Sequence, residues 1–124
     1  FQDEDQERYQ QMYTQSYQAT QAITEGPRQT EYRLFALVTR SLMDAEDKEH
    51  SDKQFYGAVD WNRRLWSTLQ FDLAAEDNLL PDELKAKLLS LAIWVDKHSS
   101  LAMKGKARIA PLISVNRSIM EGLT

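Results

Sequence analysis

The sequence predicts an all-α fold, a compact bundle of about four to five helices. Apolar residues recur at intervals of three and four along most of the chain, which is the spacing that gathers them on one face of a helix. The three prolines and four isolated glycines lie mostly where this periodicity stops or starts, as expected of residues that begin and end helices. A length of 124 residues suits one domain with a single core.

The first helical segment, up to Gly26, is polar and rich in glutamine. Its large apolar residues after Phe1 are Tyr9, Met12, Tyr13, Tyr17 and Ile23. This is too little apolar surface to dock firmly on its own against the entropy lost on ordering. Residues 1–11 hold one arginine and four acidic residues, so their removal changes the net charge from −4 to −1. We interpret residues 1–11 as an appended or fused extension, and residues 12–124 as one helical domain.

The second helix is predicted from Pro27 to about Glu49. Proline suits the first turn of a helix because its φ is already helical and its missing N–H is not needed there. Glu31 would lie near the positive end of the helix dipole. The predicted apolar face consists of Tyr32, Phe35, Val38 and Leu42.

The third helix is predicted to begin after Ser51, as its N-cap, and to reach the break EDNLLPDEL at residues 76–84. Its apolar series is Phe55, Val59, Trp66, Leu69 and Leu73. The series keeps a continuous helical rhythm only if Asn62 is counted in it. The amide of Asn62 is therefore predicted on the buried face.

The fourth helix is predicted to start at Pro81, with Asp82 and Glu83 in the first turn, where negative charge is favoured. Leu84, Leu88, Leu91 and Val95 then repeat at helical spacing. The apolar run LLSLAIWV, residues 88–95, predicts a helix that is buried nearly all round. The cations and the glycine of KGKAR, residues 104–108, predict its end.

The last helix is predicted to start near Ala110 or Pro111. Its apolar residues are Ile109, Leu112, Ile113, Val115, Ile119, Met120 and Leu123. Asn116 falls on the stripe of Ile109, Ile113 and Met120, so a second amide is predicted on a buried face.

Composition excludes several kinds of site. The chain has no cysteine, so it can form neither a disulfide nor a thiolate metal site. Its two histidines, His50 and His98, have no second ligand at the helical spacing of metal sites. The chain also lacks a glycine-rich phosphate loop and the motifs G-x-S-x-G and H-E-x-x-H. We therefore expect no metal, no other cofactor and no enzymatic activity.

Hydropathy and charge indicate where the protein works. The longest apolar run, residues 88–95, is far shorter than the roughly 20 residues of a membrane span, and the opening FQDEDQER is no secretory signal. A cytoplasmic protein without a membrane partner is expected. Residues 1–62 carry six Lys or Arg against twelve Asp or Glu, and residues 63–124 carry nine against seven. Neither half is basic enough to predict a nucleic-acid partner.

The two asparagines on predicted apolar stripes, Asn62 and Asn116, are each followed by arginine, in WNRRLW and VNRSIM. A buried amide without a partner costs about 1–3 kcal/mol, so each must form hydrogen bonds. Two interpretations remain open. The amides are satisfied inside the core, by a backbone group or by the surroundings of the other asparagine, or they are polar anchors for a partner.

The tryptophans and arginines divide between core and surface. Trp66 is in phase with the apolar stripe and is predicted in the core, whereas Trp61 lies about 100° away and is the better surface candidate. Arg63 and Arg64 point away from the stripe, where they either brace acidic neighbours or meet the carboxylates of a partner. Trp94 lies beside the stripe of the fourth helix, in the core or at the edge of an apolar groove.

Four stretches, in this order and spacing, resemble the FlaF family of flagellar biosynthesis proteins from alphaproteobacteria. They are TEYRLFALVTRSLMDA, DWNRRLWSTLQFDLA, LPDELKAKLLSLAIWVDKHS and LISVNRSIMEGL. The similarity covers nearly all of residues 12–124, and its most specific motifs are DWNRRLW and VNRSIM. Residues 12–124 are thus predicted to form one FlaF-like helical domain.

The resemblance implies a non-enzymatic cytoplasmic factor that acts on flagellin before export, as a flagellin-binding chaperone or a positive regulator, opposite a second regulator, FlbT. Flagellin termini are helical when assembled and unfolded for export, so an apolar groove could capture an amphipathic segment of them. The alternatives are a regulator of flagellin mRNA, acting directly or with FlbT, and a scaffold that holds only FlbT.

The predicted partner-binding residues combine aromatic anchors with charge at the rim, as protein-binding grooves do. They are Tyr32, Phe35, Trp61, Leu65 and Trp94 for apolar contact, and Arg63, Arg64, Asn116 and Arg117 for polar contact.

Overall fold

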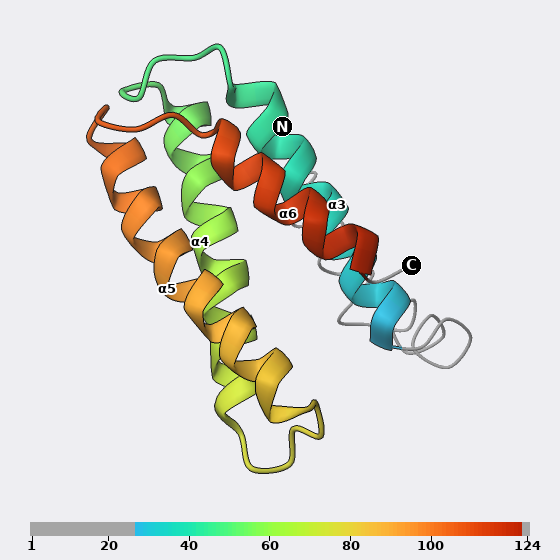
Figure 1. The fold of residues 1–124 in the computed structure, drawn as a ribbon. Helices are drawn as coiled ribbons and strands as arrows, with labels where there is room; N and C mark the ends of the chain where they lie inside the picture. The colour runs from blue at the N-terminus through green and yellow to red at the C-terminus, as the bar shows by residue number, and fades with distance from the viewer. Residues whose placement is uncertain (1–26, 123–124) are drawn as a thin grey trace.

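The computed structural model describes residues 27–122, which form four helices (Figure 1). They are α3 (Pro27–Ala45), α4 (Lys53–Ala74), α5 (Asp82–Met103) and α6 (Ala110–Gly122). The predicted all-α bundle is confirmed. The first helical segment and the extension predicted for residues 1–11 lie outside the described residues.

The helices form two pairs that are joined along α3 and α4. The chain forms a hairpin of α4 and α5, α3 packs against both α4 and α6, and α5 meets α6 over a small contact only (Figure 1). The figure shows α6 leaving α5 after their connecting loop and crossing toward α3. Because α5 has 22 residues and α6 has 13, the beginning of α5 extends well beyond the helix that follows it.

The helix boundaries largely follow the predicted ones, with two corrections. The predicted starts at Pro27 and Ala110 and the acidic first turn of α5 are confirmed. The second helix ends at Ala45 and not near Glu49, because residues 46–49 are charged and bring no apolar side chain to bury. The N-cap of α4 is Asp52 and not Ser51, since the Asp52 carboxylate accepts a hydrogen bond from the Gln54 N–H at 2.7 Å.

Gly105 reverses the chain after α5 and requires glycine. Its φ is +74°, and a Cβ built there would lie 2.7 Å from the His50 ring. We expect Gly105→Ala to lower the free energy of unfolding by about 1–3 kcal/mol, through left-handed strain and this clash. Gly57 is the matched control, because it lies inside α4 and a Cβ there meets no atom within 4 Å.

We therefore expect Gly57→Ala to raise the free energy of unfolding by about 0.5–1 kcal/mol. Urea denaturation followed by circular dichroism measures both changes. Effects of the same sign in the two variants would contradict the role of Gly105.

The core lies between the two pairs and is centred on α4. Trp66 is 1% exposed, which confirms its predicted place, and the ring of Phe35 meets it edge-on with centroids 5.8 Å apart. Other fully buried side chains come from all four helices or the residue before α6: Val38, Leu42, Val59, Val95, Ile109 and Leu112. The packing of α3, α4 and α6 around Trp66 holds the pairs together.

A chain of hydrogen bonds crosses this core from α4 to α6. Asn116 donates through Nδ2 to Asn62 Oδ1 at 2.7 Å, and Trp66 Nε1 donates to Asn116 Oδ1 at 2.9 Å. Both asparagines are fully buried. These two bonds confirm the interpretation that the amides are used inside the core: they pair both polar atoms of the Asn116 amide and the Oδ1 of Asn62. Among the residues described, Asn62 Nδ2 and Ser99 Oγ are the buried side-chain polar atoms without a hydrogen-bond partner.

The prediction that α5 is buried nearly all round is wrong. Ile93 is 50% exposed and Leu84 is 41% exposed, whereas Ala92 and Val95 are buried. The reason is that α4 packs along α5 while α6 diverges from it, so one long side of α5 has no neighbouring helix in the described bundle. The apolar start of α5 is left at the surface.

Candidate functional site

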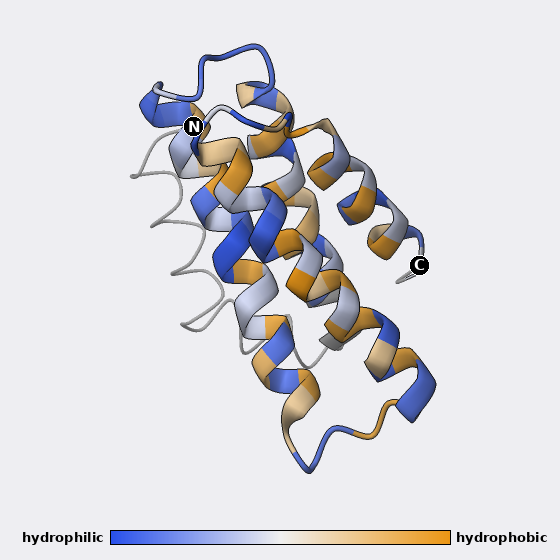
Figure 2. Cartoon of the chain, turned by 60° about the vertical axis from the view of Figure 1, so that its left-hand side comes forward, coloured by the Kyte–Doolittle hydropathy of each residue, from blue (hydrophilic) through white to orange (hydrophobic). Residues whose placement is uncertain are grey.

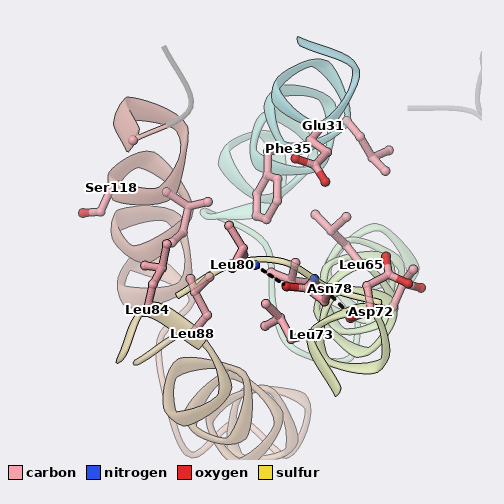
Figure 3. Close-up of a pocket in the computed structure, with 15 residues that line it drawn as sticks. Glu31, Phe35, Leu65, Asp72, Leu73, Asn78, Leu80, Leu84, Leu88 and Ser118 are labelled. Atoms are coloured by element: carbon pink, nitrogen blue, oxygen red, sulfur yellow. Dashed lines mark hydrogen bonds between the residues drawn. The ribbon is translucent and has the colours of Figure 1, made fainter. Parts of the chain in front are cut away.

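A groove opens where the α4–α5 hairpin diverges from the α3–α6 pair (Figure 3). Its volume of about 380 Å³ is within the range of sites that bind small ligands or the side chains of a partner. We call it the leucine groove, because seven of the described residues that line it are leucines. The lining consists of Glu31, Leu34, Phe35, Leu65, Thr68, Leu69, Asp72, Leu73, Asn78, Leu80, Leu84, Leu88, Ser118, Ile119 and Gly122.

All four helices contribute walls to the leucine groove. Figure 3 shows Phe35 reaching in from α3 toward leucines of α4, such as Leu65, while Leu84 and Leu88 come from the start of α5. The apolar stripes that build the core continue past the point where the helix pairs separate. The groove is therefore an extension of the core that the described helices leave uncovered.

Asn78 holds the α4–α5 loop at the edge of the groove. Its Nδ2 donates to the Asp72 carbonyl at 3.2 Å, and its Oδ1 accepts from the Leu80 N–H at 3.0 Å (Figure 3). The Lys85 ammonium also donates to the Asn78 carbonyl, at 2.6 Å. These three bonds join the end of α4 to the start of α5, so Leu80 lines the groove from an ordered loop.

Exposed apolar side chains continue outside the groove, around the hairpin tip. Leu79 is 94% exposed and Phe71 is 79% exposed, and Leu80 and Leu84 are exposed to a smaller extent. Figure 2 shows the apolar stretch of this loop between hydrophilic residues. Large apolar side chains exposed in this way near a groove are consistent with a site that a partner covers.

The comparison with known protein families decides the identity of the chain. A family model described as "Flagellar protein FlaF" matches residues 13–123. The chain belongs to the FlaF family. The search of curated proteins and the search of solved structures each gave no match. The family makes this a flagellar protein, and no helix within residues 27–122 is long and apolar enough to cross a membrane.

In this FlaF-family chain, two of the predicted partner-binding residues, Phe35 and Leu65, line the leucine groove. Phe35 is 4% exposed, so its ring belongs mainly to the core and offers only an edge to the groove. Leu65 is half-buried. Tyr32 and Trp61 are half-buried on α3 and α4, outside the groove lining.

The two arginines of WNRRLW lie on a shallow hollow that adjoins the leucine groove through Thr68. Arg63 donates to Asp96 at 2.9 Å, and Arg64 pairs with Asp60 at 3.0 Å. They brace acidic neighbours, as one of the two sequence interpretations expected. The Arg64 side chain is nevertheless 78% exposed, so it remains accessible at the flank of the groove.

The structure does not bring Trp94, Asn116 and Arg117 into the leucine groove. Trp94 stacks on His98 with ring centroids 4.7 Å apart and borders a different hollow, between α5 and α6. Asn116 is fully buried, and its amide is used within the core. Arg117 is exposed on α6 and donates to the sulfur of Met43.

Sequence reasoning missed the residues that give the groove its character. Among the lining residues, Leu69, Leu80, Leu84 and Ile119 have no predicted role in binding. Helical periodicity places three of them on helix faces and leaves Leu80 in the break between two helices. One signal was present, because the apolar pair Leu79–Leu80 interrupts an otherwise polar connection. An apolar pair in a loop does not belong to a helix face that packs on the core, so it points to a role at the surface.

Proposed function

We propose that this FlaF-family chain is a cytoplasmic flagellin-binding chaperone and positive regulator of flagellin synthesis and export. In this proposal the leucine groove takes an amphipathic helical segment of flagellin before assembly. The observation that carries it is the groove itself, an uncovered extension of the core at the open end of the bundle. A partner helix placed there would supply the neighbour that α5 lacks.

The chemistry of the groove supports apolar recognition of a helix. Helix-in-groove binding uses apolar anchors spaced at i, i+3, i+4 and i+7, and a row of leucines from α4 and α5 can pack against such a stripe. Burying a leucine fully contributes about 1.5–3 kcal/mol relative to leaving it in water. Covering the exposed parts of Leu80 and Leu84 is therefore a source of affinity.

The polar lining does not suggest catalysis. Within residues 27–122 it consists of Glu31, Thr68, Asp72, Asn78 and Ser118, and includes no histidine, lysine or arginine. A hydroxyl nucleophile would need an adjacent base and a donor for the developing oxyanion, and among the described lining residues the Asn78 amide already donates to the Asp72 carbonyl. The proposed role is therefore binding and not turnover.

The charge distribution supports a protein client over flagellin mRNA. Arg63 and Arg64, two cations beside the groove, are each held by a carboxylate. Binding to phosphates would require these pairs to break and would be strongly salt-dependent. FlbT belongs to this proposal as a second partner, and its binding is tested separately.

Isothermal titration of the full chain against monomeric flagellin tests the proposal, with FlbT titrated separately in the same buffer. Micromolar or tighter binding to flagellin is expected. Binding to FlbT alone would make the protein a regulatory adaptor and would contradict the flagellin-binding role. A salt-sensitive mobility shift with flagellin mRNA, together with no binding to flagellin, would favour the RNA alternative.

The predicted contacts on α4 carry a prediction of their own. We expect Arg64→Glu to weaken flagellin binding about tenfold, because Arg64 lies at the flank of the groove and the change reverses its charge. Trp61→Ala should weaken binding by less, because Trp61 lies outside the groove lining. Titration of both variants after a check of the helical content by circular dichroism measures this. Unchanged affinity in both folded variants would remove these two residues from the proposed site.

A further inference from the structure

We propose that residues 12–23 of this chain occupy the leucine groove and cover it until a partner displaces them. The docking of this segment does not depend on which partner protein the groove binds. Its consequence, a cap that regulates the flagellin site, rests on the proposed function. Four observations support the docking.

The first observation is where the chain joins the bundle. The described structure begins at Pro27, and the next turns of α3 supply Glu31 and Leu34 to the groove wall. Only residues 24–26 separate Ile23 from Pro27, and two to five residues are enough to connect antiparallel helices. A helix that ends at Ile23 can therefore fold back over the groove without a long linker.

The second observation is the pattern of the segment. In helical geometry Met12, Tyr13, Tyr17 and Ile23 share one face, with Ser16 at its middle. The glutamines at positions 15, 18 and 21 lie on the opposite face. Twelve residues span about 18 Å as a helix, which is too short for stability alone in water. Such a helix needs an apolar surface to form against.

The third observation is chemical complementarity. The groove has an apolar floor and a polar edge that includes the carboxylates of Glu31 and Asp72. Tyrosine suits such a boundary, because its ring can pack on leucine while its hydroxyl donates to a carboxylate. Residues 12–23 carry no charge, so they bring no repulsion to the acidic edge.

The fourth observation is the extent of the family match. It begins at residue 13, so nearly all of the proposed cap lies in the FlaF domain, whereas residues 1–11 precede the match. The apolar surface that the cap would cover, including Leu80 and Leu84, is left exposed by the described helices. A segment of the same chain reaches it at a high effective concentration.

Disulfide trapping in the full chain tests the docking, because the chain has no cysteine of its own. Ser16→Cys is combined with Leu84→Cys on the groove wall. The matched control combines Ser16→Cys with Leu101→Cys, since Leu101 lies on the same helix with a similar exposure, 43% against 41%, at the far end. We expect the first pair to form an intramolecular disulfide at least about tenfold faster.

Charges placed on the segment provide a second test. Adding Tyr13→Asp and Tyr17→Asp to the first cysteine pair should reduce trapping to the control rate, because two carboxylates would face the leucines and the acidic edge. Gln15→Asp with Gln18→Asp adds the same charge on the opposite face and should leave trapping unchanged. In cysteine-free chains, the tyrosine substitutions should strengthen flagellin binding several-fold, and the glutamine substitutions should not.

The outcomes separate this inference from the proposed function. Equal trapping rates for the Leu84 and Leu101 pairs, or only disulfides between two molecules, would overturn the intramolecular cap whatever flagellin does. Fast trapping at Leu84 without flagellin binding to any variant would uphold the cap and contradict the proposed client.

Discussion

Leu84→Asp is expected to weaken flagellin binding about 100-fold or more while the fold stays intact. In the complex, this side chain would be covered by the client, where a carboxylate without a partner costs several kcal/mol and the leucine contact is lost. A loss of about 2.7 kcal/mol already corresponds to 100-fold. The free protein should tolerate the change, because Leu84 is 41% exposed and lies in the first turn of α5, where the helix dipole favours an acidic residue.

Leu101→Asp is the matched control for this prediction. It introduces the same charge on the same helix at 43% exposure, at the end of α5 opposite the groove. Its flagellin affinity should remain within about threefold of the unmodified chain. Calorimetric titration measures both affinities, and thermal unfolding checks both folds. Equal losses in the two variants would contradict the leucine groove as the docking site.

Asn116→Ala is expected to lower the free energy of unfolding by about 3–5 kcal/mol. The change removes both hydrogen bonds that cross the core, so Trp66 Nε1 and Asn62 Oδ1 lose their partner at fully buried positions. Each orphaned buried group costs about 1–3 kcal/mol, and the vacated volume adds to this. Stability of a small domain is only about 5–15 kcal/mol, so this variant should be close to unfolding at 37 °C.

The neighbouring Arg117→Ala provides the control, because Arg117 is exposed and its polar contact is with the sulfur of Met43. We expect it to change stability by no more than about 0.5 kcal/mol. Urea denaturation of both variants measures the difference. A loss below about 1 kcal/mol for Asn116→Ala would show that the buried amides contribute little to the stability of the core.

Much of the fold could be predicted from local sequence. Helical periodicity, Pro27, the acidic turn after Pro81 and the glycine at position 105 act within a few residues, so the helices and most of their ends follow from them. Some predictions were wrong. The N-cap of α4 is Asp52 and not the neighbouring Ser51, and α5 is not buried nearly all round. The run LLSLAIWV appeared buried all round because periodicity reports how apolar a helix is, and not how many neighbours it has.

The candidate site was predicted only in part. Phe35 and Leu65 line the leucine groove, because both lie on stripes that continue from the core into it. Asn116 was ambiguous in the sequence, since a buried amide and a binding anchor have the same pattern. Only the 2.7 Å bond to Asn62, more than fifty residues away in the chain, assigns its amide to the core.

The sequence by itself determined the helices, their apolar stripes, the place of Trp66 in the core and the membership of the FlaF family. The tertiary structure decided which apolar residues are left uncovered. This depends on the lengths and crossing directions of α5 and α6, which are set by contacts between residues far apart in the chain. The divergence of these helices leaves the apolar stripe of Leu84 and Leu88 uncovered, and with Leu80 of the preceding loop it forms the wall of a groove.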